Sequence, residues 1–372
     1  MQPATEADLA EAVTSATGPL RVVGGSTRDI GRPVVGTALS VAGLSGIDLY
    51  EPGALTVVVR AGTPLAELES VLAAENQRLP FEPMDHRPLL GTTGAPTIGG
   101  VVAANVSGPR RVQGGACRDF LLGVRFVDGS GTVVKNGGRV MKNVTGYDLV
   151  KLMAGSWGTL GVLTELSFKV LARPETEATL VAEGLSAKDG VAALCRALGS
   201  PFDVSGAAHV GGGRTLVRVE GLSGSVTYRA GRLADLLPGF ETVEGEASAT
   251  LWRDVRDVTA FAGHDGAVWR VSVKPTDGPV LSAALETAGV PHEAVFDWGG
   301  GLVWLSMGSA SADTVRREVA ALGGHATLVR ATQAERAEVP VFQPEPAPLA
   351  AITAGLRQRF DPRGILNPGL MG

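Results

Sequence analysis

Runs of apolar and polar positions divide the first half of the chain into short strands and helices. The Val-rich run 54–60 is typical of a strand that is buried on both faces. Thr63 and Pro64 mark the start of a helix, because proline is favoured in the first helical turn. The full set predicted for this half comprises helices over 5–16, 63–74 and 148–154, strands over 20–23, 54–60 and 162–171, a hairpin over 120–135, and a helix that opens within 98–105.

The second half alternates strand-like and helix-like segments. The predicted strands are 179–182, 215–220, 267–273, 302–306 and 326–329, and the predicted helices are 188–198, 281–288 and 312–322. Mixed elements of this length favour an antiparallel sheet with helices on one face. Four prolines between residues 339 and 348 indicate a linker before a last helix over 349–360. We therefore expect an α+β protein with a first domain over 1–174, a second over 175–338, and a tail over 339–372.

Composition narrows the classes to which the chain can belong. Its 372 residues suffice for two domains with separate cores. A net charge of −5 without a basic stripe argues against a nucleic-acid partner. The sequence starts without a signal-peptide pattern and contains no run of about 20 apolar residues. We expect a cytoplasmic protein, with the inner membrane reached through partner chains as the alternative.

Cysteines and common ligand motifs give no catalytic assignment. Cys117 and Cys195 are too few for a disulfide framework or for the usual four ligands of an iron–sulfur cluster. We expect both thiols to be inert packing groups, and Trp252 and Trp298 to lie in the core of the second domain. The sequence lacks G-x-G-x-x-G, a Gly-Lys pair, G-x-S-x-G and H-E-x-x-H, so the sites that these motifs build are unsupported.

Glycine provides the main positive signal. There are 51 glycines, and three glycine-rich segments fall in the first domain, at 22–27, 96–105 and 155–161. Small residues let the backbone approach a ligand, and successive N–H groups can form a nest for an anion. Each segment alone is a weak indication, because a glycine turn after a strand is more often a plain connector. Three such segments in one domain predict a ligand of dinucleotide size.

The order of these motifs resembles one family of flavoproteins. Gly-Gly-Ser-Thr at 24–27, Thr-Ile-Gly-Gly at 97–100, Gly-Ser-Trp-Gly-Thr-Leu-Gly at 155–161 and Asn-Pro-Gly at 367–369 are similar to the vanillyl-alcohol-oxidase (PCMH-type) family. Within this family, Met-Lys-Asn-Val-Thr-Gly-Tyr-Asp-Leu at 141–149 is most like the FAD-binding subunits of bacterial glycolate oxidases. The likeness covers roughly residues 20–174 and 355–370.

The resemblance implies a fold and a set of cofactor residues. The fold is a PCMH-type FAD-binding domain of two α/β subdomains, with a cap domain whose antiparallel sheet is covered by helices. The residues assigned to FAD are Gly24, Gly25, Ser26 and Thr27 in the first loop, Thr97, Ile98, Gly99, Gly100 and Asn105 in the second segment, Gly155, Ser156, Gly158, Thr159, Gly161 and Val162 in the third, and Asn367 in the tail. Because no His lies near the first loop, we expect FAD to be bound non-covalently.

Two departures from the family pattern affect the expected chemistry. Relatives that oxidise 2-hydroxy acids have Glu where this chain has Trp157, which we expect to be a packing residue. They also carry a His-rich metal motif in the cap. The His residues of the second domain here, His209, His264, His292 and His325, show no two-ligand spacing. We therefore expect no metal site, and the catalytic residues stay unassigned.

The resemblance also implies a reaction and partners. The reaction is the oxidation of glycolate to glyoxylate, with electrons passing through the flavin to a partner iron–sulfur subunit. The family complex also has a larger FAD-containing subunit, where we expect substrate oxidation mainly to occur, with this chain as a second FAD carrier. Two alternatives stay open: a self-sufficient FAD-dependent oxidase or dehydrogenase of another small alcohol or hydroxy acid, and a structural subunit without catalysis.

Several polar residues near the glycine segments have a functional and a plain interpretation. We expect His86 to be a solvated loop residue rather than a general base. Asp148 is expected to be a helix N-cap, with flavin contact secondary. For Arg110 and Arg111, a solvated pair, neutralisation of the FAD phosphates and a partner contact all stay open.

Overall fold

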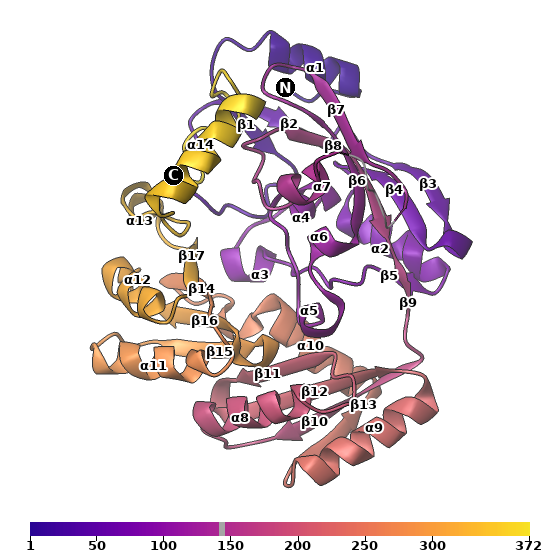
Figure 1. Cartoon of the computed structure of the whole chain (residues 1–372), viewed down its shortest axis with the longest axis vertical. Helices are drawn as coiled ribbons and strands as arrows, with labels where there is room; N and C mark the ends of the chain where they lie inside the picture. The colour runs from indigo at the N-terminus through magenta and orange to yellow at the C-terminus, as the bar shows by residue number, and fades with distance from the viewer. Residues whose placement is uncertain (141–145) are drawn as a thin grey trace.

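The computed structural model describes residues 1–140 and 146–372. They form two large antiparallel sheets, the two-stranded sheets β1-β2 and β5-β9, and a C-terminal tail (Figure 1). Residues 141–145, which carry part of the family likeness, lie outside the described residues. No helix in the described ranges is both long and apolar enough to cross a membrane.

The elements of the first half are short. Its helices are α1 (Glu6–Thr14), α2 (Leu65–Ala74), α3 (Arg87–Leu90), α4 (Ile98–Ala103), α5 (Arg111–Gly114), α6 (Cys117–Phe120) and α7 (Leu149–Met153). Its strands are β1 (Leu20–Val23), β2 (Thr37–Ser40), β3 (Ile47–Glu51), β4 (Thr56–Arg60), β5 (Gln77–Arg78), β6 (Leu121–Val127), β7 (Val133–Gly137), β8 (Val162–Lys169) and β9 (Leu171–Ala172). The 3₁₀ turn η1 (Pro52–Ala54) precedes β4.

The elements of the second half are longer. Its strands are β10 (Thr176–Ala182), β11 (Gly206–Val210), β12 (Arg214–Gly221), β13 (Glu241–Glu244), β14 (Ala267–Ser272), β15 (Glu293–Asp297), β16 (Leu302–Met307) and β17 (His325–Arg330). Its helices are α8 (Ala187–Leu198), α9 (Ser223–Leu236), α10 (Gly245–Asp257), α11 (Asp277–Thr287), α12 (Ala312–Ala321), α13 (Gln333–Glu338) and α14 (Ala347–Phe360). Three 3₁₀ turns, η2 (Gly211–Gly213), η3 (Thr259–Phe261) and η4 (Trp298–Gly300), complete it.

The first half is built on a five-stranded sheet of order β3-β4-β8-β6-β7, in which all neighbours are antiparallel. Strand β4 lies between β3 and β8, and its Val57, Val58 and Val59 are fully buried, as the Val-rich run predicted. Val57 and Val59 share one core with Leu68 and other residues of α2. Helices α2 and α4 therefore pack with the sheet in one apolar core. Helix α4 also forms one wall of the candidate site.

The C-terminal tail returns to the first half of the chain. Strand β1 pairs in parallel with β2, and Leu20 forms a further parallel bridge with Leu366. Arg363 donates to the carbonyl oxygens of Val13 and Gly129, at 2.5 and 2.9 Å. Figure 1 shows α14 beside β1, next to the first half of the chain. The tail thus places its last residues next to the loop that follows β1.

The second half is built on an eight-stranded antiparallel sheet of order β13-β10-β12-β11-β15-β16-β14-β17. Neighbouring residues of a strand point to opposite faces of the sheet. At β12, helices pack against both of these faces. Val217 packs with Val226 of α9, whereas Leu216 packs with Trp252 of α10. An antiparallel sheet covered by helices is confirmed. The expectation of helices on one face only is wrong, because α10 packs on the face opposite α9.

Charged side chains join the two halves of the chain along one contact region, which we call the seam. The seam comprises residues 78–82 and 108–111 of the first half and residues 218–220, 270 and 297–298 of the second. Arg110 and Arg78 both donate to Glu220, at 2.7 and 2.8 Å, and Arg218 donates twice to Glu82, at 3.1 Å each. Arg110 therefore belongs to a buried ion network, and a solvated role for it is wrong.

Candidate functional site

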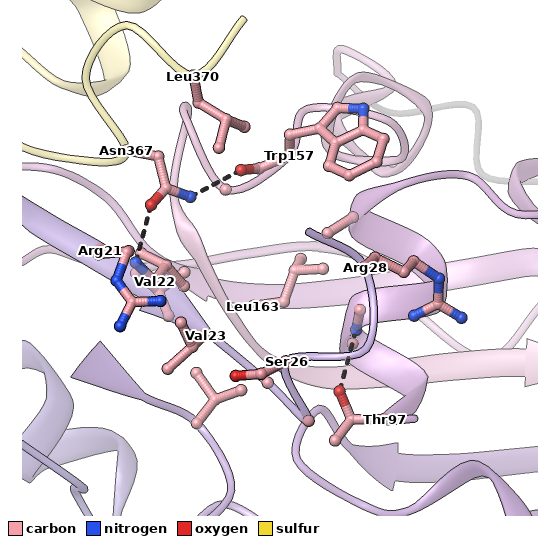
Figure 2. A pocket seen from close by; sticks show the side chains of 18 of the residues that line it. Arg21, Val22, Val23, Ser26, Arg28, Thr97, Trp157, Leu163, Asn367 and Leu370 are labelled. Atoms are coloured by element: carbon pink, nitrogen blue, oxygen red, sulfur yellow. Dashed lines mark hydrogen bonds between the residues drawn. The ribbon is translucent and has the colours of Figure 1, made fainter. Parts of the chain in front are cut away.

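A cavity of about 410 Å³ opens between β1, α4 and the tail (Figure 2). It is lined by Arg21, Val22, Val23, Gly24, Gly25, Ser26, Thr27, Arg28, Asp29, Ile30, Arg32, Val34, Val41, Ala61, Thr97, Gly99, Gly100, Ala103, Trp157, Gly158, Gly161, Val162, Leu163, Asn367 and Leu370. Residues from the three predicted segments and from the tail thus meet around one space.

The first loop can approach the second segment because it lacks side chains. A Cβ on Gly25 would lie 1.6 Å from the carbonyl oxygen of Ala95, and a Cβ on Gly24 would lie 2.4 Å from Thr97 Oγ1. Ser26 adopts a left-handed backbone conformation, with φ of 54°. Only glycine leaves room for this contact, so the loop presents main-chain groups to the cavity.

Helix α4 starts where the sequence predicted a helix. The Thr97 hydroxyl accepts a hydrogen bond from the Gly100 N–H at 3.3 Å, which caps the first turn. A Cβ on Gly99 would lie 2.6 Å from the carbonyl oxygen of Ala61, so glycine lets the helix sit close to the end of β4. Ile98 points away from the cavity into the core, where it is fully buried.

The third segment packs against the end of α4. The N–H groups of Gly155 and Trp157 donate to the carbonyl oxygens of Val102 and Ala103, at 3.0 and 2.9 Å. Trp157, at φ of 53°, also packs edge-on against Phe342. The packing role predicted for Trp157 is confirmed, although this residue lines the cavity as well.

Four of the predicted cofactor residues besides Ile98 do not line the cavity. They are Asn105, Gly155, Ser156 and Thr159. Asn105 Oδ1 accepts the N–H of Arg118 at 3.1 Å, and Thr159 donates its hydroxyl to the Ser156 carbonyl at 2.7 Å. The Ser156 hydroxyl is buried and has no partner among the described residues. These residues shape the segments, and their contact with a cofactor stays a prediction.

Asn367 connects the tail to two of the segments (Figure 2). Its Oδ1 accepts the N–H of Val22 at 2.8 Å, and its Nδ2 donates to the carbonyl oxygen of Trp157 at 2.8 Å. Because the side-chain amide of Asn367 hydrogen-bonds to both the first and the third segment, it fixes the distance between them. The tail is therefore part of the wall of the cavity.

Arg28 is a cavity residue that the sequence analysis missed. Its Nε and Nη2 atoms are buried without a hydrogen-bond partner in the described parts of the chain. Burial lowers the pKa of Arg28 to about 10, although the Asp85 carboxylate acts in the opposite direction. Unsatisfied buried donors are unfavourable, and an anionic group in the cavity would satisfy them. Its position directly after Gly-Gly-Ser-Thr is the signal that could have identified it.

His86 is buried, so its prediction as a solvated residue is wrong. Only 7% of it is exposed. Burial and, next, the positive charge of Arg28 lower its pKa to about 3, which keeps the ring neutral. Its Nδ1 has no partner among the residues that the structure describes. Burial is the larger cause of the lowered pKa, and the charge of Arg28 adds to it, because a proton on this ring would place a second cation near Arg28.

The expectations for Asp148, Cys117 and Trp252 are met, whereas Trp298, expected in the core of the second domain, is only partly buried and donates to the Gly108 carbonyl oxygen of the first half. Asp148 caps α7 by accepting the Lys151 N–H at 3.1 Å. Cys117 is fully buried, and burial raises the pKa of its thiol. Trp252 is buried in the second half of the chain. Within the described ranges, no group of three or more His, Cys, Asp or Glu side chains is arranged to hold a metal ion.

The cavity fits the cofactor that the sequence motifs imply. The glycine-rich loops leave space for a large ligand, and Arg28 supplies guanidinium N–H donors that have no partner among the described residues and could bind an anion. Residues 1–137 match the FAD binding domain family. A solved structure of alkyldihydroxyacetonephosphate synthase is similar in fold, with a TM-score of 0.69, 15% identity, and coverage of 99% of this chain and 76% of that one. The family match and the site together define an FAD-binding protein.

Curated relatives identify the family. The chain is 38% identical to the glycolate oxidase subunit GlcE of Escherichia coli over 355 residues, which cover 95% of this chain and 92% of the relative. It is also 38% identical to the glycolate oxidase subunit GlcD of Bacillus subtilis, over 34% of this chain and 26% of the relative. The chain therefore belongs to the family of the GlcE subunit, and FAD is its cofactor.

Proposed function

We propose that this chain is the FAD-binding subunit of a glycolate (2-hydroxy-acid) oxidase complex and supports the oxidation of glycolate to glyoxylate. The observation that carries the proposal is the likeness to the GlcE subunit along nearly the whole of both chains. The cavity supports it, because residues far apart in sequence line one space that suits a flavin nucleotide.

When bound, FAD supplies the acceptor for the hydride that leaves the substrate carbon. The chain's own residues hold and surround that group. The first loop offers backbone groups, Arg28 offers a cation, and Asn367 keeps the first and third segments together. Within this proposal, the cofactor contacts are the residues assigned from the family likeness, with Arg28 added.

The proposal extends to organisation and partners. Residues 1–174 would be the FAD-binding domain, 175–338 the cap, and 339–372 the linker and returning tail. The partners would be a larger FAD-containing subunit and an iron–sulfur subunit that receives the electrons. The complex would work in the cytoplasm, with any contact to the inner membrane made through those partners.

The test compares the chain alone with the chain co-expressed with both partner subunits. We expect the purified chain to carry non-covalent FAD, which acid precipitation releases into the supernatant. Anaerobic glycolate should bleach the flavin of the co-expressed complex. Oxygen-dependent peroxide production from glycolate by the isolated chain would instead support a self-sufficient oxidase. A colourless chain that does not take up added FAD would support a structural subunit.

A further inference from the structure

The segment that follows the last strand of the eight-stranded sheet reaches a loop of the flavin cavity. We call residues 332–343 the strap; it follows β17 and contains α13. Within the strap, Arg336 is buried, with only 8% of its surface exposed. An arginine is rarely this buried unless its donors are paired. The acceptors of Arg336 all lie in the first half of the chain.

Arg336 holds the backbone of one loop by three hydrogen bonds. Its Nη1 donates to the carbonyl oxygens of Asp29 and Gly31, at 2.8 and 3.2 Å, and its Nη2 donates to Asp29 Oδ2 at 2.6 Å. No other donor in the described ranges bonds to these two carbonyl oxygens. One guanidinium group therefore fixes the course of a loop that lies about 300 positions earlier in the chain.

The loop that Arg336 holds carries unpaired cations of the cavity. We call residues 28–32 the arginine loop, because Arg28 and Arg32 at its two ends both line the cavity. Nε of each arginine, and Nη2 of Arg28, are buried donors with no partner among the described residues. From the other side, the Arg32 N–H donates to the carbonyl oxygen of Leu370 at 3.0 Å. The arginine loop is thus held between the strap and the tail.

The strap itself is anchored in the second half of the chain. The Val341 carbonyl oxygen accepts the N–H of Leu328 in β17 at 2.9 Å, and Arg316 of α12 donates to the Phe342 carbonyl oxygen at 2.9 Å. The Phe342 ring also packs against Trp157, which lines the cavity. The strap therefore connects the eight-stranded sheet with two walls of the cavity, which are the arginine loop and the third segment.

We infer that Arg336 is a positioning residue for FAD, which holds the arginine loop against the cavity and so slows release of the cofactor. Arg336 does not line the cavity, and it acts through Arg28 and Arg32. Groups that already hold the bound geometry lose less freedom when the ligand binds, and tighter binding is expressed mainly as slower dissociation. The inference goes beyond the proposed function, because it holds whichever acid the complex oxidises and gives the second half of the chain control over cofactor retention.

The experiment measures the rate at which FAD leaves the full chain. The FAD-loaded protein is diluted below its FAD dissociation constant, and release is followed by the recovery of flavin fluorescence. We expect Arg336→Gln to release FAD about 10- to 100-fold faster, the range for losing a hydrogen bond made by a charged group. Arg336→Lys keeps the charge but lacks the fork that reaches both carbonyl oxygens, so we expect an intermediate rate.

Arg330→Gln is the matched control. Arg330 is also an arginine of the second half that donates to backbone carbonyl oxygens, among them those of Leu89 in the first half, at 2.9 Å, and Phe261, at 2.8 Å. Neither Arg330 nor these acceptors line the cavity. Each variant loses three hydrogen bonds of one arginine. We expect Arg330→Gln to release FAD at the rate of the unaltered chain.

Hydrogen exchange of the FAD-free chain tests the positioning step without the cofactor. We expect peptides that cover the arginine loop to exchange faster in Arg336→Gln than in the unaltered chain and in Arg330→Gln. Peptides that cover β4 should exchange alike in all three proteins. If Arg336→Gln does not fold, Arg336→Lys takes its place in both measurements, with faster release and faster exchange expected.

Equal rates of FAD release from the unaltered chain and the Arg336 variant would overturn the inference. Equal acceleration by Arg330→Gln would overturn it as well, because any loosening between the two halves would then suffice. Faster release without faster exchange in the arginine loop would also overturn it, since Arg336 would not act through that loop.

Discussion

The buried arginines of the seam and of the cavity differ in whether a carboxylate pairs with the guanidinium group. In the seam, Arg218 and Arg110 are bonded to Glu82 and Glu220, and these four charges satisfy one another. At the cavity, Arg28 is buried with two donor atoms that have no partner among the described residues. The pairing indicates that Arg218 and Arg110 hold the structure together, whereas the unpaired donors of Arg28 suit an anionic ligand.

The direction of the pKa shifts follows this difference. The carboxylates beside Arg218 raise its pKa despite the opposing effect of burial. Arg28 and Arg270 have no bonded carboxylate in the described chain, and burial lowers the pKa of each to about 10. We expect a buried cation with a carboxylate partner to stabilise the fold, and the unpaired guanidinium of Arg28 in the cavity to bind a ligand. The predictions below test this distinction.

The largest effect is expected from breaking the seam network with Glu220→Ala. Only 3% of the Glu220 side chain is exposed, and its loss leaves Arg78 and Arg110 without that carboxylate. We expect urea denaturation to show a free energy of unfolding lower by about 3–5 kcal/mol, as for other broken buried pairs. The control Glu183→Ala removes the exposed partner of Arg214, where about 0–1 kcal/mol is expected. Similar losses in the two variants would contradict the structural role of the network.

The second effect concerns the unsatisfied arginine of the cavity. We expect Arg28→Gln to raise the FAD dissociation constant about 10- to 100-fold, because a hydrogen bond between charged groups is lost. Quenching of flavin fluorescence measures this constant. The free energy of unfolding of the FAD-free chain should not fall, since the variant removes an unpaired buried charge. A marked loss of stability with unchanged FAD affinity would show that Arg28 is structural, like the seam arginines.

The third prediction tests whether FAD binding needs the close contact between the backbone of the first loop and the loop at Ala95, independently of the charge of Arg28. Gly25→Ala places a Cβ 1.6 Å from the Ala95 carbonyl oxygen, so the two loops must move apart. We expect weaker FAD binding and a free energy of unfolding lower by about 1–3 kcal/mol, as for overpacked sites. Gly53→Ala is the control, because nothing lies within 4 Å of its Cβ position. If the two variants bind FAD equally well, close approach of the first loop does not build the site.

The smallest effect is a pH dependence at His86, between the cavity and the seam. Its pKa is about 3 in the folded chain, so below the ordinary value of about 6.5 the unfolded chain binds the extra proton. Stability should therefore fall as the pH falls from 6.5 towards 3. Between pH 6.5 and 5 we expect a loss of about 1–2 kcal/mol, which His86→Gln should abolish. Denaturation at pH 5 and at pH 7.5 checks this, and parallel losses in both proteins would disprove it.

Local pattern predicted those parts of the fold that depend on neighbouring residues. The run 54–60 became β4, the turn at 128–131 lies between β6 and β7, and Thr97 caps α4. Helices α9 and α10 were not predicted. Helix α9 has three buried residues in fourteen, so its sequence carries a weak apolar period. Tertiary packing on the eight-stranded sheet stabilises this helix where the local signal is weak.

Motif order predicted where the site would form, but burial could not be read from the same residues. His86 stands between charged neighbours in sequence and yet is buried. Arg28 and Arg110 look alike in sequence, and only their neighbours in space separate them. Those neighbours come from distant segments, such as Glu220 for Arg110.

The sequence by itself determined the glycine positions, the strands β4, β6, β7 and β8 of the five-stranded sheet, and the family of FAD-linked oxidoreductases. It did not predict β3, the edge strand of that sheet. These features depend on local backbone freedom and on the spacing of apolar residues, which a sequence displays directly. Only the tertiary structure decided which buried cations have a carboxylate partner. That property depends on distances between residues such as Arg111 and Arg270, which are 159 positions apart in the chain and meet on Trp298.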